Sequence, residues 1–177
     1  MKPHPLNLLQ RLASLVLLGA LAWNAPAADI TWDTSSDPDV QGGDGNWNST
    51  ETNWTTDGGG TRVAWTNALF SGDTALFTTN FGRVLLTEGI GLAGLRVTST
   101  ESGTLGGRAN VGYLFQGAGA MSFGSLTGNF DVTGAGVRNF QVDNNLIGIG
   151  GLTVASVGGG TGDGRFILAG DNSGLSG

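Results

Sequence analysis

The chain of 177 residues carries eight Lys and Arg against 14 Asp and Glu, and this acidic balance argues against nucleic acid or an anionic membrane as a partner. It contains no cysteine, which excludes disulfide bonds. Its 33 glycines follow no Gly-x-y period, so a collagen-like chain is excluded and the glycines are assigned to turns.

The first 27 residues have the pattern of a secretory signal peptide. Lys2 and Arg11 give a positive start, residues 12–23 are an apolar run, and Ala25-Pro26-Ala27 supplies small residues for cleavage. The apolar run is shorter than the roughly 20 residues that span a bilayer, so we expect export without membrane insertion of the mature chain. Cleavage leaves six arginines against 14 carboxylates, a net charge of −8.

Residues 28–78 differ from the rest in carrying tryptophan among Asp, Asn, Thr and Gly. Four tryptophans lie here: Trp32, Trp47, Trp54 and Trp65. We favour an interpretation in which they are apolar plugs of an N-terminal cap that covers the first coil of a stacked fold. The alternative is a set of exposed platforms, with Trp32, Trp47 and Trp54 stacking on the rings of a glycan.

Residues 79–177 read as repeated short strands and glycine-rich turns. Eight apolar runs carry this pattern: 84–86, 95–97, 113–115, 121–123, 130–132, 140–142, 152–154 and 166–168. Five of the eight place a polar residue between two apolar ones, the period-2 signature of a strand with one buried face. No helical periodicity follows the signal peptide, so the sequence predicts an all-β chain.

A repeat within this region indicates how the strands are arranged. Ile90-Gly-Leu-Ala-Gly-Leu-Arg-Val97 and Ile147-Gly-Ile-Gly-Gly-Leu-Thr-Val154 are identical at five of eight positions. Short strands, glycine-rich turns and repetition favour a parallel β-helix, or solenoid, over the alternative, an antiparallel β-sandwich. The spacing of the strands is uneven and yields no single coil length.

Once the signal peptide is cleaved, the chain has few groups for catalysis. His4 and Lys2, the only histidine and lysine, leave with it, which excludes most nucleophilic and metal-dependent enzymes, and we expect no cofactor. A glycoside hydrolase or lyase built on two carboxylates remains the rival. Asp37, Asp39 and Asp44 are weak calcium candidates, but their spacing fits no EF-hand loop, so we interpret them as turn residues and expect no metal.

Two stretches resemble the autotransporter-associated β-strand repeat and the large surface proteins that carry it. The C-terminal one is Gly150-Gly-Leu-Thr-Val154 with Phe166-Ile-Leu-Ala-Gly-Asp-Asn-Ser-Gly174. The N-terminal one, Ile30-Thr-Trp-Asp33 to Asn53-Trp54, resembles the opening of such proteins. Ala169 departs from the usual serine of the repeat, and the turn lacks its usual tyrosine.

The resemblance implies a passenger-type β-helix of a Gram-negative cell surface, secreted or displayed at the outer membrane. The expected function is a non-enzymatic scaffold or adhesin that meets an extracellular glycan or another cell-envelope component. A lectin-like or polysaccharide-cleaving protein is the alternative. Self-secreting members end in a transmembrane barrel, so this chain is expected to be a fragment or to rely on a partner. We also expect the C-terminal edge of the 79–177 repeat region to be open and to allow self-association.

Overall fold

The computed structural model describes residues 28–70, 72–133, 138–155 and 165–176. Over these ranges the chain forms strands and one single-turn helix, α2 (Asn67–Phe70), which confirms the predicted all-β class. None of the described residues belongs to a helix long and apolar enough to cross a membrane. The predicted signal peptide, residues 1–27, lies outside the described part of the chain.

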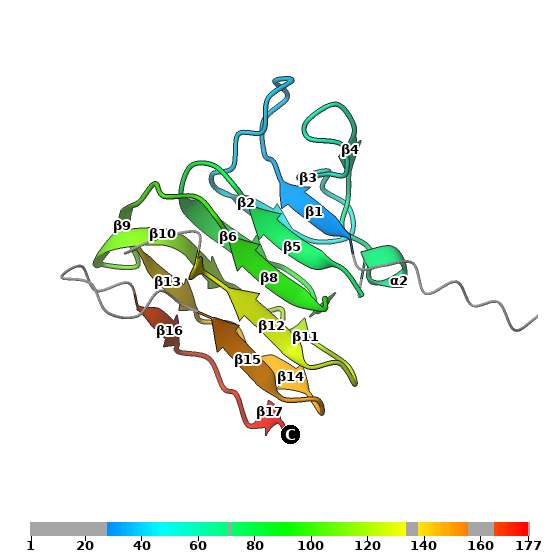
Figure 1. Ribbon diagram of the computed structural model, residues 1–177, viewed down its shortest axis with the longest axis vertical. Coiled ribbons are helices and arrows are strands. Elements are labelled where there is room, and N and C mark those ends of the chain that lie inside the picture. The colour runs from blue at the N-terminus through cyan, green and yellow to red at the C-terminus, as the bar shows by residue number, and fades with distance from the viewer. Residues whose placement is uncertain (1–27, 71, 134–137, 156–164, 177) are drawn as a thin grey trace, which may run out of the picture.

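The strands form three sheets, which we call A, B and C (Figure 1). In the spatial order of sheet A, the strands are β15 (Leu152–Ala155), β12 (Gly128–Asp131), β8 (Gly94–Val97), β5 (Thr74–Phe77), β1 (Asp29–Trp32), β3 (Trp54–Thr55) and β4 (Arg62–Val63). In sheet B they are β16 (Phe166–Leu168), β13 (Asn139–Val142), β10 (Arg108–Gln116), β6 (Gly82–Leu86) and β2 (Gly45–Trp47), with β9 (Gly103–Leu105) paired to β10. In sheet C they are β17 (Gly174–Leu175), β14 (Leu146–Gly148), β11 (Met121–Ser122) and β7 (Ile90–Gly91).

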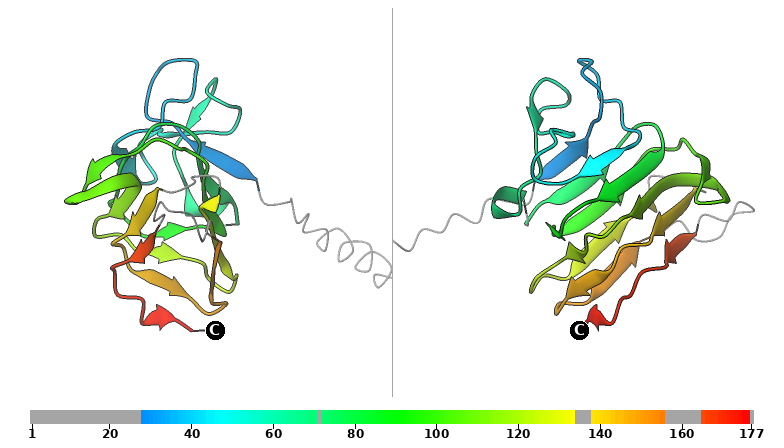
Figure 2. Two further views of the ribbon diagram at one scale, coloured as in Figure 1. Left: turned by 60° about the vertical axis from the view of Figure 1, so that its left-hand side comes forward. Right: turned by 180° about the vertical axis from the view of Figure 1, so that it is seen from behind.

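Successive groups of strands visit sheets A, B and C in turn, and we call each group a layer. Layer 1 is β5-β6-β7, layer 2 is β8-β10-β11, layer 3 is β12-β13-β14 and layer 4 is β15-β16-β17. Strands of neighbouring layers pair in parallel: Phe140, for example, is in register with Tyr113 and with Phe166. Two further views show the layers stacked from the N-terminal elements to β17 (Figure 2).

Antiparallel pairing is confined to the margins of this stack. Within the described ranges it joins β1 to β3, β3 to β4, and β9 to β10. The alternative prediction of an antiparallel β-sandwich is therefore wrong, because the strands that form the layers pair in parallel.

The strands form where apolar and polar residues alternate. In β6, Val84 and Leu86 are buried while Arg83 and Leu85 face outward. Each of the eight predicted apolar runs overlaps an observed strand. Within residues 79–177, the strands that the sequence did not reveal are β9 and three members of sheet C, namely β7, β14 and β17, which have only two or three residues and include glycine.

The sequence repeat falls at the same corner of two layers but in a different register from the one predicted. Ile90 pairs with Met121, and Met121 pairs with Leu146, so the equivalent of Ile90 is Leu146 and not Ile147. A shift of one residue turns a strand side chain to the opposite face. Ile90 is accordingly buried, whereas Ile147 faces outward and is 45% exposed.

A column of aromatic rings runs through the core, with one phenylalanine from each layer. Phe77 of layer 1 lies 5.1 Å from Phe115, Phe115 lies 5.0 Å from Phe140, and Phe140 stacks on Phe166 at 5.4 Å, all measured between ring centroids. Phe77 also contacts Trp54, 5.7 Å away, at the N-terminal end of the column. The column therefore links the tryptophan-rich segment to layer 4.

Layer 1 is closed off on its N-terminal side in all three sheets. In sheets A and B, strands β1 and β2 continue the ladder beyond layer 1. In sheet C, side chains replace a strand: the Gly91 N–H donates to Asn67 Oδ1 at 2.7 Å, and Trp65 Nε1 donates to the Gly91 carbonyl at 3.0 Å. Such closure prevents another chain from pairing with the edge.

Layer 4 is less well covered. Its strands are the last members of the three sheets, and its inward residues Leu152, Phe166 and Leu175 are only partly buried. Val154 and Leu168 are 40% and 37% exposed. Self-association through this edge stays a prediction.

A buried ion pair fixes the loop that follows β1. Asp33 has no exposed surface, and its Oδ2 lies 3.2 Å from Arg62 Nη2 on β4. Its Oδ1 accepts hydrogen bonds from the backbone N–H groups of Ser35 and Gln41. A second Arg62 nitrogen donates to the Asp33 carbonyl. The pair thus joins β1, the 35–41 loop and β4.

We predict that replacing a phenylalanine of the aromatic column with alanine lowers the free energy of unfolding most where the ring is most deeply buried. Phe77→Ala should lower the free energy of unfolding by about 3–5 kcal/mol, because it removes a fully enclosed ring. Phe166→Ala should cost about half as much, because part of that ring is in contact with solvent. Urea unfolding of both variants is the measurement, and equal losses would contradict the difference in burial.

A second prediction concerns the buried ion pair. Arg62→Ala should destabilise the protein by about 3–5 kcal/mol, because it leaves the Asp33 carboxylate buried without its partner. Arg96→Ala is the matched control: it removes an exposed ion pair with Asp29 and should cost about 0–1 kcal/mol. Similar urea midpoints for the two variants would show that the Asp33–Arg62 pair contributes no more to the free energy of unfolding than an exposed ion pair does.

Candidate functional site

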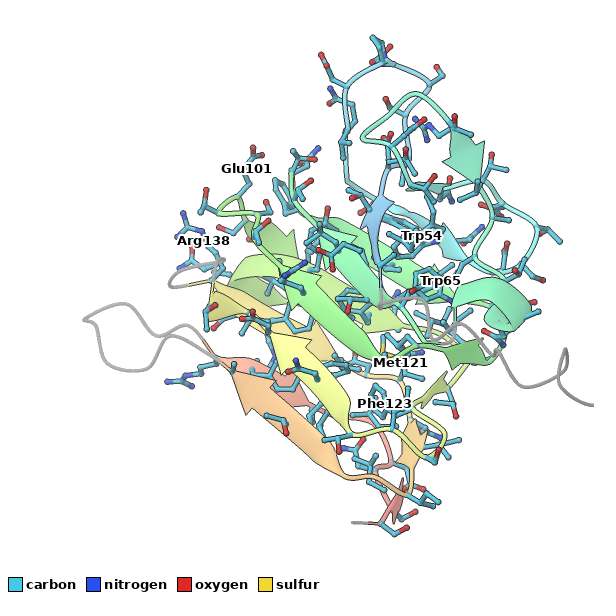
Figure 3. All side chains as sticks on the ribbon, turned by 45° about the vertical axis from the view of Figure 1, so that its right-hand side comes forward. Trp54, Trp65, Glu101, Met121, Phe123 and Arg138 are labelled. Carbon is cyan, nitrogen blue, oxygen red and sulfur yellow. The ribbon has the colours of Figure 1, made fainter. Side chains whose placement is uncertain are left out.

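The tryptophans predicted to bind glycan are in the interior of the N-terminal end. Trp32, Trp47, Trp54 and Trp65 have no exposed surface. Trp54 lies 4.7 Å from Trp47 and 5.0 Å from Trp32 between ring centroids. Figure 3 shows Trp54 and Trp65 together above layer 1.

These contacts leave no indole face for a sugar ring. The faces of Trp32, Trp47 and Trp54 are occupied by one another and by Phe77. The Trp32 Nε1–H donates to the Gly43 carbonyl at 3.0 Å, so its polar atom is also engaged. The glycan-stacking prediction for these three residues does not hold for the folded chain, and their burial fits the interpretation as plugs.

This burial has a spectroscopic consequence. Iodide should quench the fluorescence of Trp32, Trp47, Trp54 and Trp65 weakly in the native protein and strongly after unfolding in urea, because a charged quencher does not enter an apolar core. The measurement is made on chain that lacks Trp23. Strong native quenching that an added oligosaccharide suppresses would instead indicate exposed sugar platforms.

The calcium candidates do not form a cage. Asp37, Asp39 and Asp44 are all exposed, and Asp44 Oδ1 accepts a hydrogen bond from the Arg83 N–H at 2.6 Å. Among the described residues, no group of three or more acidic, histidine or cysteine side chains is close enough to hold a metal ion. Asp37, Asp39 and Asp44 lie in bends between strands.

Three other aspartates have lowered pKa values. The Thr61 N–H, followed by the Thr61 and Thr55 hydroxyls, lowers the pKa of Asp57 to about 2. The Thr133 hydroxyl lowers the pKa of Asp131, and the Ser173 N–H lowers that of Asp171. A glycosidase general acid requires a raised pKa, so none of these three is suited to that role.

The corner between sheets C and A contains the feature that the sequence did not predict. Its length changes along the stack: the chain advances by five positions from Ile90 to Leu95, by nine from Met121 to Phe130 and by eight from Leu146 to Val154, all of them equivalent positions in the ladders. The later corners therefore extend beyond the first one.

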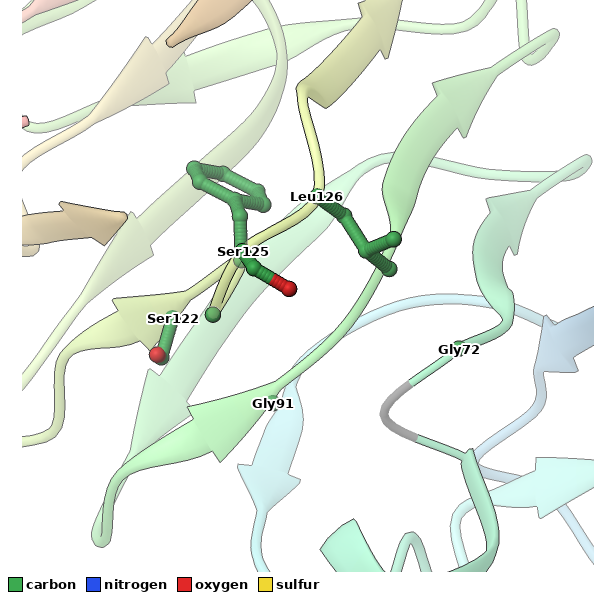
Figure 4. Close-up of a pocket in the computed structure, with 7 residues that line it drawn as sticks. Gly72, Gly91, Ser122, Ser125 and Leu126 are labelled. Atoms are coloured by element: carbon green, nitrogen blue, oxygen red, sulfur yellow. The ribbon is translucent and has the colours of Figure 1, made fainter. Parts of the chain in front are cut away.

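This step in corner length leaves a shallow hollow of about 290 Å³. It is lined by Gly72, Gly91 and residues 122–126. Figure 4 shows the side chains of Ser125 and Leu126 pointing into the space between this corner and the segments at Gly72 and Gly91. The lining offers glycine backbone, two serine hydroxyls and apolar surface, with no ionisable side chain.

Exposed apolar residues gather beside the hollow. Leu126 and Ile149 are 46% and 68% exposed, and Ile147 pairs with Ser122 on the same outward face. The Ile149 N–H donates to the Gly124 carbonyl at 3.0 Å, which places the second and third corners in contact. Exposed apolar side chains of this kind are suited to contact with a partner rather than to acid–base chemistry. Its only signal in the sequence was the presence of Leu126, Ile147 and Ile149, apolar residues that lie close to glycines and outside the predicted apolar runs.

Comparison with known proteins relates the chain to one class of surface protein. No protein-family model matches the chain, so the resemblance to the autotransporter-associated repeat stays a prediction, and no solved structure matches it. Over 165 residues, 92% of its length, the chain is 31% identical to the adhesin BmaC autotransporter of Brucella suis biovar 1 (strain 1330). The matched stretch is 4% of that protein, so the similarity relates the chain to a small segment of an autotransporter adhesin.

Proposed function

We propose that this chain is an exported, non-enzymatic segment of a surface passenger protein, and that it acts as a stiff scaffold with an adhesive outer face. The observation that supports this proposal most is the stack of four layers, in which three parallel sheets run along a continuous apolar core. A parallel β-helix is the architecture that such stacking describes. The similarity to an autotransporter adhesin supports the adhesive role.

The proposed organisation has three parts. Residues 1–27 are a cleaved signal peptide, 28–78 a cap, and 79–177 the repeat region. The cap is supported by the closed N-terminal edge, where the tryptophans, β3 and β4 cover the start of the core. A cap of this kind keeps the first layer from pairing with other chains.

The adhesive role is assigned to outward-facing positions. Inward positions are filled by apolar side chains, and the corners differ in length from one layer to the next. Corners and outward residues can therefore vary without disturbing the core, which is how a rigid scaffold carries binding surfaces. The placement of the carboxylates supports a binding role over catalysis.

Export and adhesion can be tested together. We expect the full 177-residue chain, expressed in a Gram-negative host, to leave the cytoplasm and to begin at Ala28 by intact-mass analysis. Beads coated with the exported protein should adhere to cultured epithelial cells several-fold better than beads coated with albumin. Protein unfolded before coating is the control, because adhesion by a scaffold requires the folded outer face.

Two results would contradict the proposal. The export claim fails if the protein stays in the cytoplasm with Trp23 still attached. The adhesive role fails if native and unfolded coatings adhere equally. A reducing-sugar assay on polysaccharides adds a further check, since turnover would identify an enzyme instead.

A further inference from the structure

The backbone nitrogen of Ala28, the first residue after the expected cleavage site, lies against a carboxylate. Ala28 N donates a hydrogen bond to Asp73 Oδ1 at 2.8 Å. Cleavage after Ala27 turns this nitrogen from an amide into an α-amino group, which carries a positive charge at neutral pH. The contact then joins a cation to an anion.

The ladder of sheet A holds Asp73 in place. Asp73 directly precedes β5, and its carbonyl accepts a hydrogen bond from the Ala93 N–H at 2.9 Å. Thr74, the first residue of β5, donates its N–H to the Ala28 carbonyl at 2.9 Å. β1 and β5 therefore begin side by side, next to α2 (Figure 1). The Asp73 carboxylate lies at the start of β1.

The charges around Asp73 leave it available to a new cation. Among the described residues, Asp73 belongs to no ion pair. The charged groups on the strands of this part of sheet A are Asp29 on β1, Arg96 on β8 and Asp131 on β12; Arg96 forms an ion pair with Asp29 and is in register with Asp131. β3, β5 and α2 contain no charged side chain. Asp73 is therefore the acidic group that a cation at Ala28 would meet.

The α-amino group has a further distinction in residues 28–177. This part of the chain contains no lysine, histidine or cysteine. Its six arginines stay charged, and burial raises the pKa of Tyr113, the single tyrosine. The α-amino group is thus the one group of this part of the sequence whose charge changes between neutral and mildly alkaline pH, so a change of stability in that range reports on Ala28.

We propose that cleavage after Ala27 creates an ion pair between the α-ammonium group of Ala28 and the Asp73 carboxylate, and that this pair secures the first strand of the fold after export. Hydrolysis of the Ala27–Ala28 peptide bond consumes one water molecule: the Ala27 carbonyl carbon becomes a carboxylate, and the Ala28 nitrogen becomes an ammonium group. The inference rests on the proposed function, because the signal peptidase that cleaves this bond acts during export.

The pair is favourable because both partners are already in position. An exposed ion pair between side chains contributes little, partly because two flexible side chains have to be ordered. Here the cation belongs to the backbone, which pairing of β1 with β5 and β3 already fixes. β1 carries Ile30 and Trp32 into the core, so the pair stabilises a strand on which the N-terminal core depends. The uncleaved chain, whose Ala28 nitrogen is an uncharged amide, lacks this contribution.

The test compares thermal unfolding of the processed chain, which begins at Ala28, with two altered forms. The processed chain is taken from export, or released from a removable N-terminal fusion so that the result does not depend on export. In one altered form Ala28 is acetylated, which restores an uncharged amide. In the other, Asp73→Asn removes the carboxylate. Asp39→Asn is the matched control, because it removes the same charge from an exposed bend.

At about pH 6.5, the processed chain should melt about 2–4 °C above both altered forms, and Asp39→Asn should melt within about 1 °C of it. A carboxylate partner stabilises the charged amine, so the pKa of the Ala28 amino group should be higher in the folded than in the unfolded chain. The stabilisation is then complete below the unfolded pKa and is lost as the pH rises through the folded pKa. The melting temperatures of the processed and altered forms should therefore converge by about pH 10.

A combined form separates the ion pair from any other effect of the two changes. Acetylation of the Asp73→Asn variant should lower the melting temperature little further, because the partner of the amine is already absent. If Asp73→Asn does not fold, the acetylated wild-type chain still decides the question, because its sequence is unchanged.

The inference is overturned if acetylation leaves the melting temperature unchanged at about pH 6.5, or if Asp39→Asn lowers it as much as Asp73→Asn does. It is also overturned if the difference between the processed and acetylated chains persists at about pH 10, or if export yields a chain that begins at another residue. A protein that is exported, begins at Ala28 and adheres to cells, but shows none of these differences in melting temperature, retains the proposed function and loses only this inference.

Discussion

Pairing of backbone groups between layers is the constraint on which the structure depends. Most strands have only two to five residues, too few to be stable alone or as a hairpin. Each gains its hydrogen bonds from the strands above and below, and Phe140 stacks on Phe166 because parallel pairing sets these two side chains over one another. A defect in one layer should therefore reach its neighbours through both the ladder and the core.

The two ends of the stack differ in how completely their outermost strands are covered. At the N-terminal end, the edge of β7 is closed by the Asn67 and Trp65 side chains, which bond the Gly91 backbone as a strand would. The Asp33–Arg62 pair fixes the loop beside this end. At layer 4, Val154 and Leu168 keep exposed apolar surface on strands without charged side chains. The N-terminal end is thus specialised for closure, whereas layer 4 retains the character of an interior layer.

The all-β class and the eight apolar strands could be predicted from the sequence, because alternation in runs such as Phe140-Gln-Val142 reports directly on burial. Sheet C was largely missed because Ile90–Gly91 and Gly174–Leu175 are too short to alternate. The register of the repeat failed for another reason: sequence identity aligned Ile147 with Ile90, whereas the ladder places Leu146 there, and the corner that follows is three positions longer in the later copy. Tryptophan in a polar segment is compatible with a buried plug and with an exposed platform; the sequence favoured the plug, and the positions of Trp47 and Trp54 within the core agree with it.

Variation in corner length links the fold to its outer surface. The inward row from Ile90 through Met121 to Leu146 is apolar throughout, so the core imposes one pattern on every layer. The corners obey no such rule, and the longer corner between layers 2 and 3 produces both the hollow at Gly91 and the exposed Leu126. A repeated core thus provides a fixed frame, and the corners between sheets C and A carry the variation of the outer surface.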